Sequence, residues 1–193
     1  MIRQPSAYLD SNILLPYYLS DLVLTLAHHG FYKFYWSQYL LDEMCAVAGR
    51  QGRQKRSLDS LNSQWEAIQG SGLGKNLIAE SAWKEILPQI TGPDRDDYPH
   101  TAAAIAGGVE FLVTENLRDF NAELLSSNGV RIIKADDFLS MLAFGQESFM
   151  IEVLRKRVSE FSRPELTLGE YLQGFSKTTP NFAEHLRVTI LGN

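Results

Sequence analysis

The segment DRDDYPHTAAA, which begins at residue 94, places three carboxylates within four positions directly before an alanine-rich run. Solubility does not require this arrangement, and neighbouring carboxylates raise one another's pKa by repulsion. A divalent cation relieves that repulsion. Mg²⁺ takes hard oxygen ligands in octahedral geometry and often keeps waters, and Mn²⁺ has similar preferences. Such a site can activate water and stabilise charge in phosphodiester cleavage, with one ion or two.

Further acids follow the apolar runs that we expect to form strands. Asp10 ends the run SAYLD, and Asn116 and Asp119 follow the run FLVT. Sites in open parallel sheets form outside the carboxyl ends of strands, so two strands would deliver these side chains to one edge. Glu43 borders the apolar stripe of an expected helix, where an unpaired carboxylate would be costly. Together with Asp97, these residues could face one place.

Each acid also has a simpler explanation. Asp97 could only cap the alanine-rich helix and satisfy its dipole, and Asp10 could be a turn residue. Glu43 alone could be a partly exposed helix residue, and Asp119 alone could be a loop acid. The constellation, rather than any single acid, predicts a site.

The elements that would position these acids alternate between strand and helix patterns. Strands are expected at residues 6–10, 31–37, 109–114 and 130–135, and helices in LSDLVLTLAHHG, QYLLDEMCAVAG, 50–70 and the alanine-rich run. The helix over 50–70 is expected to be polar and exposed, and SGLGK after it to be a break. Ser20 and Ser37 are candidate N-caps, and Gly30 is a candidate C′ residue. The alternation predicts a parallel α/β sheet with right-handed crossovers.

The pattern changes from about residue 136, where apolar residues follow helical spacing. We expect about three helices there, on the residues Met150, Val153, Leu154, Val158, Phe161, Leu168, Tyr171, Leu172 and Phe175. The predicted organisation is one α/β domain over 1–140 and a small helical C-terminal extension over 141–193. The extension would pack on the domain or contribute to a protein interface.

The composition is that of an ordinary soluble globular chain: 193 residues, 45% hydrophobic, 21% charged, with a net charge of −5. No global basic field indicates nucleic-acid binding, and the single cysteine, Cys45, fits a reducing cytosol. The N-terminus lacks the apolar core of a signal peptide, and no apolar run approaches the roughly 20 residues of a membrane span. We therefore expect a soluble, cytoplasmic protein with no membrane association.

The segments YLDSNIL, LLDEM and DRDDYPHTAAAIAGGVEFLVTENLRDF resemble the PIN-domain ribonucleases, specifically the VapC-like toxins of type II toxin–antitoxin pairs, over residues 5–140. The last segment is the most specific, and the tail resembles the C-terminal extension of one VapC-like subfamily. The resemblance implies a three-layer α/β/α fold with a central parallel sheet and a Mg²⁺- or Mn²⁺-dependent endoribonuclease activity. It also implies an antitoxin that blocks the acidic pocket, and a homodimer or higher oligomer.

The resemblance also assigns roles to individual residues. By position, the metal-binding acids of the family correspond to Asp10, Glu43, Asp97 and Asp119. Asn116 would orient water or a ligand as a fifth catalytic residue, and Asp96 would be an auxiliary acid. Similar sequences often have His two residues after the key acid, where this chain has Pro99; His100 comes one place later. His100 could ligate metal, act as a general acid, or be a hydrogen-bonding structural residue.

A basic cluster lies just past the helix of Glu43 and consists of Arg50, Arg53, Lys55 and Arg56. These cations could bring the RNA polyanion to an acidic pocket, or they could be a solvated helix start. The aromatic residues within 31–36 could stack on bases, but a buried strand is the favoured interpretation.

Two other functions stay open on the sequence. A catalytically silent PIN-fold module would serve only as a binding partner, although all four acids are present. A DNA-directed nuclease would use the same domain, although no DNA-threading arch is visible. An aspartyl phosphatase would usually carry a DxD pattern, and Asp10-Ser11-Asn12 does not have one.

Overall fold

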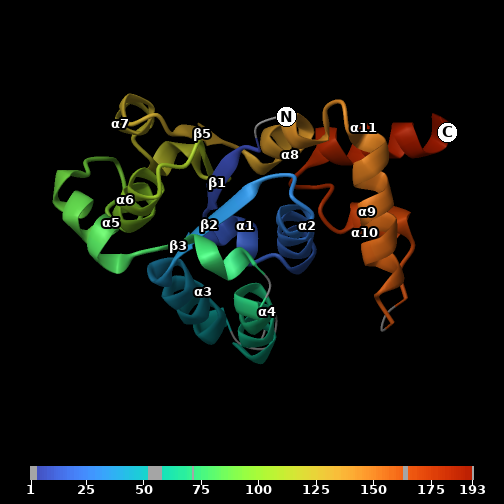
Figure 1. The fold of residues 1–193 in the computed structure, drawn as a ribbon, viewed down its shortest axis with the longest axis horizontal. Coiled ribbons are helices and arrows are strands. Elements are labelled where there is room, and N and C mark those ends of the chain that lie inside the picture. Colours follow the sequence, from blue (N-terminus) through green and yellow to red (C-terminus); the bar gives the residue numbers. More distant parts are fainter. Residues whose placement is uncertain (1–3, 52–57, 71, 163–164, 193) are drawn as a thin grey trace.

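The computed structural model of this protein describes residues 4–51, 58–70, 72–162 and 165–192. The described strands form a five-stranded sheet in the order β3-β2-β1-β4-β5, and their pairings are parallel. The strands are Ser6–Leu9 (β1), Lys33–Ser37 (β2), Leu77–Ile78 (β3), Phe111–Val113 (β4) and Arg131–Ile133 (β5). Helices flank this sheet (Figure 1), so the predicted α/β/α fold with a central parallel sheet is confirmed.

The helices connect the strands in the alternating order that the sequence predicts. They are Ser11–Leu14 (α1), Tyr17–His28 (α2), Gln38–Gln51 (α3), Leu58–Gly70 (α4), Glu80–Ile86 (α5), Tyr98–Ala106 (α6), Ala122–Ser127 (α7), Ala135–Ala143 (α8), Glu147–Ser159 (α9), Leu168–Gln173 (α10) and Pro180–Gly192 (α11). Three short 3₁₀ turns are also described: Leu73–Asn76 (η2), Leu87–Gln89 (η3) and Leu117–Asp119 (η4).

The central strand β1 and its neighbour β4 are buried on both faces, as expected for parallel strands covered by helices. Their residues Ala7 to Leu9 and Phe111 to Val113 are at most 2% exposed. The register pairs Leu9 with Val113. The next residue on each strand is polar, so Asp10 and Thr114 meet at the carboxyl edge of the sheet.

The predicted helix caps have mixed outcomes. The Ser37 hydroxyl accepts a hydrogen bond from the amide of Leu40 at 3.3 Å, which confirms it as the cap of α3. Gly30 has φ +83°, the left-handed conformation that a C′ glycine adopts after α2. The prediction for Ser20 is wrong: Pro16 precedes the first turn of α2, and Ser20 is buried inside the helix.

No strand or helix is predicted directly after SGLGK, yet this segment contains β3 and α5. A two-residue strand has no periodicity to detect, which explains why β3 was not predicted. Helix α4 is also less exposed than predicted, because it buries Leu61 and Ile68 and brings Trp65 against Trp36.

Helices α9 to α11 follow α8 and pack against the rest of the molecule (Figure 1). Asp21 of α2 accepts hydrogen bonds from Arg157 Nε at 3.1 Å and from the Tyr171 hydroxyl at 2.7 Å. Asp136 of α8 accepts the amides of Asn181 and Phe182 at 3.2 and 2.9 Å, which caps α11. The tail is therefore helical and packed, as predicted. Among the described helices, none combines the length and apolarity needed to cross a membrane.

Candidate active site

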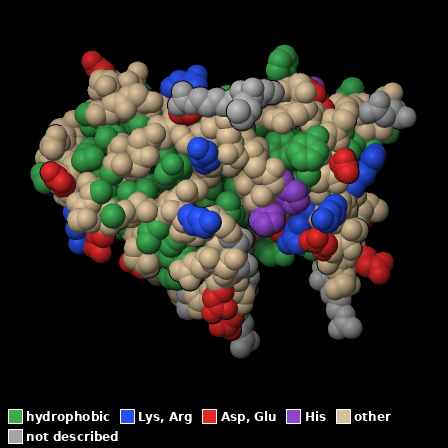
Figure 2. Space-filling view, in the orientation of Figure 1, with side chains coloured by type: hydrophobic (Ala, Val, Ile, Leu, Met, Phe, Trp, Pro, Cys, Tyr) green, Lys and Arg blue, Asp and Glu red, His purple; other side chains and the backbone are tan. Residues whose placement is uncertain are grey.

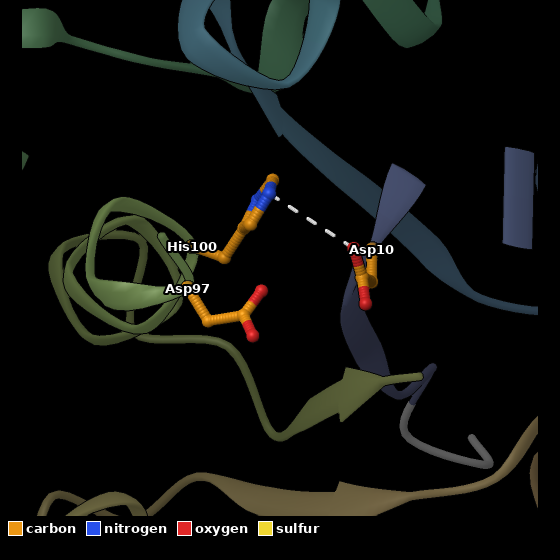
Figure 3. A group of neighbouring side chains, drawn as sticks. All are labelled: Asp10, Asp97 and His100. Carbon is orange, nitrogen blue, oxygen red and sulfur yellow. Dashed lines mark ion pairs between the residues drawn. The ribbon is translucent and has the colours of Figure 1, made fainter. Parts of the chain in front are cut away.

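Asp10 stands at the carboxyl end of β1 with one carboxylate oxygen held in place. Its Oδ2 accepts hydrogen bonds from Asn12 Nδ2 and from the Thr114 hydroxyl, both at 2.6 Å. Asn12 Nδ2 also lies 3.0 Å from Thr114 Oγ1, so the three side chains form one closed group. Asp10 is 4% exposed. Its Oδ1 lies 3.9 Å from His100 Nε2, toward α6 (Figure 3).

Asp97 is the N-cap residue of α6, and Pro99 lies in the first turn of that helix. Within the described chain, the Asp97 side chain makes no capping hydrogen bond, which argues against a capping role alone. Its carboxylate points instead toward Asp10 (Figure 3). Burial, the charge of Asp10 and, less strongly, those of Asp94 and Asp119 raise the pKa of Asp97 to about 7, against the opposing effect of His100.

Asp10, Asp97 and His100 form a compact group of potential metal ligands. Each offers one ligand atom, and these atoms lie within 4.8 Å of one another. Ligands in an octahedron of about 2.1 Å radius lie roughly 3–4 Å apart, so small side-chain shifts would let them share one ion. Burial and the nearby charge of Asp10 both disfavour ionised Asp97. Two carboxylates in this state fit a hard divalent cation such as Mg²⁺ or Mn²⁺.

His100 is fully buried and hydrogen-bonded at both ring nitrogens. Nε2 lies 2.8 Å from Glu43 Oε2, and Nδ1 lies 3.0 Å from the Tyr8 hydroxyl. Burial lowers the pKa of His100, but the hydrogen bond to Glu43 and the charges of Asp10, Glu43 and Asp97 together outweigh it and raise the pKa. The ring therefore both satisfies buried hydrogen bonds and borders the acids.

Glu43 and Asp119 lie around this group rather than in it. Among the described residues, the compact set of potential ligands includes neither of them. Glu43 projects from α3 and meets His100, as its hydrogen bond shows. Asp119 is half-buried in η4, and its charge contributes to the raised pKa of Asp97. Glu43 thus contacts the group through His100, and Asp119 acts on Asp97 through its charge.

Comparison with protein-family models matches residues 6–118 to the PIN domain. The chain belongs to the PIN domain family. The match covers more than half of the sequence, includes Asp10, Glu43 and Asp97, and ends one residue before Asp119. Searches among curated proteins and among solved structures found no match.

PIN domains are generally metal-dependent nucleases, and Asp10, Asp97 and His100 of this PIN domain are placed where they could hold a metal ion. The two acids of the compact group come from different parts of the fold, Asp10 directly after β1 and Asp97 directly before α6. The sheet and α6 together therefore fix the spacing of the pair.

Two further predicted residues of the PIN domain lie outside the compact group of ligands. Asn116 is exposed, and its backbone N–H donates to Thr114 Oγ1 at 3.0 Å. Asp96 is exposed, and its carbonyl accepts from the Tyr39 hydroxyl at 3.2 Å. Asp94 Oδ1 accepts the amide of Asp96 at 2.9 Å, so it stabilises the turn before α6.

The predicted basic cluster falls outside what the structure describes. Arg53, Lys55 and Arg56 are not among the described residues, and neither is the side chain of Arg50. On the face drawn in Figure 2, Lys and Arg side chains are scattered among acids rather than gathered into one field.

Four residues that contact the site were not predicted from the sequence: Tyr8, Asn12, Ser37 and Thr114. A signal existed for two of them. Tyr8 lies two residues before Asp10 and so shares its face of the strand. Thr114 follows β4 as Asp10 follows β1. The contacts made by Asn12 and Ser37 depend on how the strands align, which no local pattern reveals.

Proposed function

We propose that this PIN domain is a Mg²⁺- or Mn²⁺-dependent endoribonuclease. The observation that carries the proposal is the approach of Asp10, Asp97 and His100, whose ligand atoms lie within 4.8 Å of one another. Burial and the charge of Asp10 raise the pKa of Asp97 to about 7, so a cation between the two carboxylates would be favourable. A fold keeps such a pair at a cost in stability when the pair serves a function. The resemblance to VapC-like toxins supports RNA as the substrate.

In the proposed reaction, Asp10 and Asp97 would hold the ion, with Glu43 and Asp119 beside them. When bound, the ion supplies activation of water and charge stabilisation for an in-line attack on the phosphodiester, without a covalent enzyme intermediate. Thr114 and Asn12 keep Oδ2 of Asp10 fixed, so its orientation is set before substrate binds. Asn116 would orient water or the substrate from the exposed rim.

The direct test is cleavage of single-stranded RNA and DNA oligonucleotides by partner-free protein, with Mn²⁺ or Mg²⁺ and with EDTA. We expect RNA to be cut only when metal is present. We expect Asp97→Asn to lower the cleavage rate by more than about 100-fold. Asp94→Asn is the matched control, because it changes an exposed acid of the same turn. Equal cleavage by wild type and Asp97→Asn, or activity that survives EDTA, would show that the assigned site is wrong. Preferential DNA cleavage would favour the DNA-directed alternative.

We further propose that the protein is a cytoplasmic toxin restrained by an antitoxin, and that it forms a homodimer or higher oligomer. Support comes from the resemblance to VapC-like toxins. Induced expression should arrest growth, Asp10→Ala should relieve the arrest, and a small antitoxin should be encoded in the adjacent reading frame. A harmless wild type that still binds a protein partner would favour the catalytically silent module.

The path of the RNA and the division of the chain are also proposals. Arg50, Arg53, Lys55 and Arg56 would bind phosphates beside the site, so neutralising them should weaken RNA binding and lower its salt dependence. The nuclease domain would span 1–140 and the extension 141–193, a boundary that falls within α8.

A further inference from the structure

A buried chain of hydrogen bonds runs from the start of α3 through the sheet to Glu43. The Leu40 amide donates to Ser37 Oγ at 3.3 Å, and Ser37 Oγ lies 2.8 Å from the Tyr8 hydroxyl. The Tyr8 hydroxyl lies 3.0 Å from His100 Nδ1, and His100 Nε2 lies 2.8 Å from Glu43 Oε2. Ser37, Tyr8 and His100 are each 0% exposed.

The Glu43 carboxylate accepts in its bond with His100, so the Nε2–H of His100 is the donor of this bond, whichever of Tyr8 and Nδ1 donates in the bond between them. The distance of 3.9 Å from Nε2 to Asp10 Oδ1 is too long for a hydrogen bond. The Nε2 proton is therefore committed to Glu43.

We propose that His100 is a positioning residue that holds the Glu43 carboxylate beside the Asp10–Asp97 pair, with Tyr8 and Ser37 holding His100 in turn. This inference rests on the proposed metal-dependent nuclease. A glutamate on α3 has three side-chain torsions, and its placement next to repelling carboxylates requires a fixed donor. His100 supplies that donor from α6, the helix that also carries Asp97, and the sheet fixes the donor through Tyr8.

The opposing role for His100 is direct ligation of the ion through Nε2. That role would require Nε2 to release Glu43 and the imidazole proton to move to Nδ1. The two roles differ in what a substitution can replace. A glutamine can still donate an N–H to Glu43, whereas a phenylalanine cannot.

The test compares Mn²⁺ affinity, kcat and KM for His100→Gln, His100→Phe and Tyr8→Phe. Loss of an outer hydrogen-bond partner typically costs about 10–100-fold in metal affinity or activity. We expect His100→Phe to weaken Mn²⁺ binding and lower kcat by that factor, with KM for RNA little changed. His100→Gln should restore most of the loss, and Tyr8→Phe should give a smaller loss.

Tyr32→Phe is the matched control, because Tyr32 is also fully buried and its hydroxyl donates elsewhere, to the Val23 carbonyl at 3.0 Å. Pulsed EPR of the Mn²⁺ complex distinguishes positioning from direct ligation. If His100 only positions Glu43, we expect no coupling between the manganese and a nitrogen of His100. A nitrogen coupling that disappears in His100→Phe would overturn the proposal in favour of direct ligation.

The remaining outcomes also decide. Wild-type affinity in a folded His100→Phe would overturn the positioning role while leaving the proposed function intact. If His100→Phe does not fold, the other two variants decide in its place. The proposal would be overturned if His100→Gln bound Mn²⁺ as weakly as a metal-site knockout. It would also be overturned if Tyr8→Phe matched the wild type in Mn²⁺ affinity and kcat. Failure of the wild type itself to bind Mn²⁺ or cleave RNA would remove the proposed function, and this inference with it.

Discussion

Asp97 is the residue at which stability and function oppose each other. Its pKa is 3.8 as an ordinary carboxyl and about 7 in the folded protein, so the native state binds the proton more tightly than the unfolded state. Folding stability from this group is therefore greatest at low pH and is lost as the pH rises from about 4 to about 7. Above that window the native state holds an ionised carboxylate against Asp10.

Asp97→Asn should consequently raise the thermal stability of the metal-free protein while removing metal binding. Asparagine keeps the shape of the side chain without the charge, so the increase in Tm should be larger at pH 8 than at pH 5. Asp94→Asn, at an exposed position, should show no comparable pH-dependent difference. The same Tm shift for Asp97→Asn at both pH values would contradict the repulsion. The measurement is differential scanning fluorimetry in EDTA.

Asp10, Asp97 and Asp119 could be proposed from the sequence because each follows an apolar run or opens a helix, and Glu43 because it borders the apolar stripe of its helix. The partners of those acids could not. The hydrogen bond between Thr114 and Asp10 joins residues 104 positions apart in the sequence, and the one between His100 and Glu43 joins residues 57 positions apart. Such contacts depend on strand register and helix packing, which only the folded chain defines.

At the scale of elements, helix α6 holds Asp97 because it lies close to the sheet. Ala102, Ala103 and Ala104 are each 0% exposed, and α6 packs on β1, β2 and β4 and on its neighbours α3 and α5. Small side chains permit this approach, as the alanine-rich sequence indicates.

Ala103→Leu should therefore push α6 outward, reduce cleavage and destabilise the protein by about 1–3 kcal/mol, the usual range for overpacking a core. Ala122→Leu makes the same change at an exposed position of α7 and should be nearly neutral. Urea unfolding together with the RNA cleavage assay measures both effects. Wild-type stability and activity in Ala103→Leu would mean that the packing of α6 does not set the position of Asp97.

The strands β1, β2 and β4 were predictable because short runs of apolar and aromatic residues mark buried parallel strands, and the edge strand β5 because Ile132 and Ile133 are β-branched. Strand β3 was not, since two residues carry no pattern. The start of α2 was misplaced because Pro16, with its fixed φ, begins the helix earlier than the cap-like Ser20 suggests.

At the scale of the whole molecule, Asp21 joins the α/β core to the helices that follow it. Its buried carboxylate accepts hydrogen bonds from Arg157 of α9 and from Tyr171 of α10. The partners lie 136 and 150 residues away, beyond the reach of any sequence pattern. Removing one of them would leave a buried charge short of donors.

Arg157→Gln should destabilise the protein by about 2–3 kcal/mol, since Asp21 loses a charged partner. Arg187→Gln is the matched control, because Arg187 pairs with Glu184 on the exposed surface of α11. It should change stability by less than about 0.5 kcal/mol. Urea denaturation of both variants gives the comparison, and equal midpoints would show that the Asp21 contacts do not hold the helices in place.

The central claim is that Asp10 and Asp97 share a divalent cation. Anomalous diffraction from crystals grown with Mn²⁺ measures this directly, because the ion is located independently of any assumed ligand. The expected result is a manganese peak within about 2.0–2.3 Å of Asp10 Oδ1 and an Asp97 oxygen, absent from Asp97→Asn crystals. A wild-type crystal with no peak between these two carboxylates, or with manganese bound only elsewhere, would contradict the account.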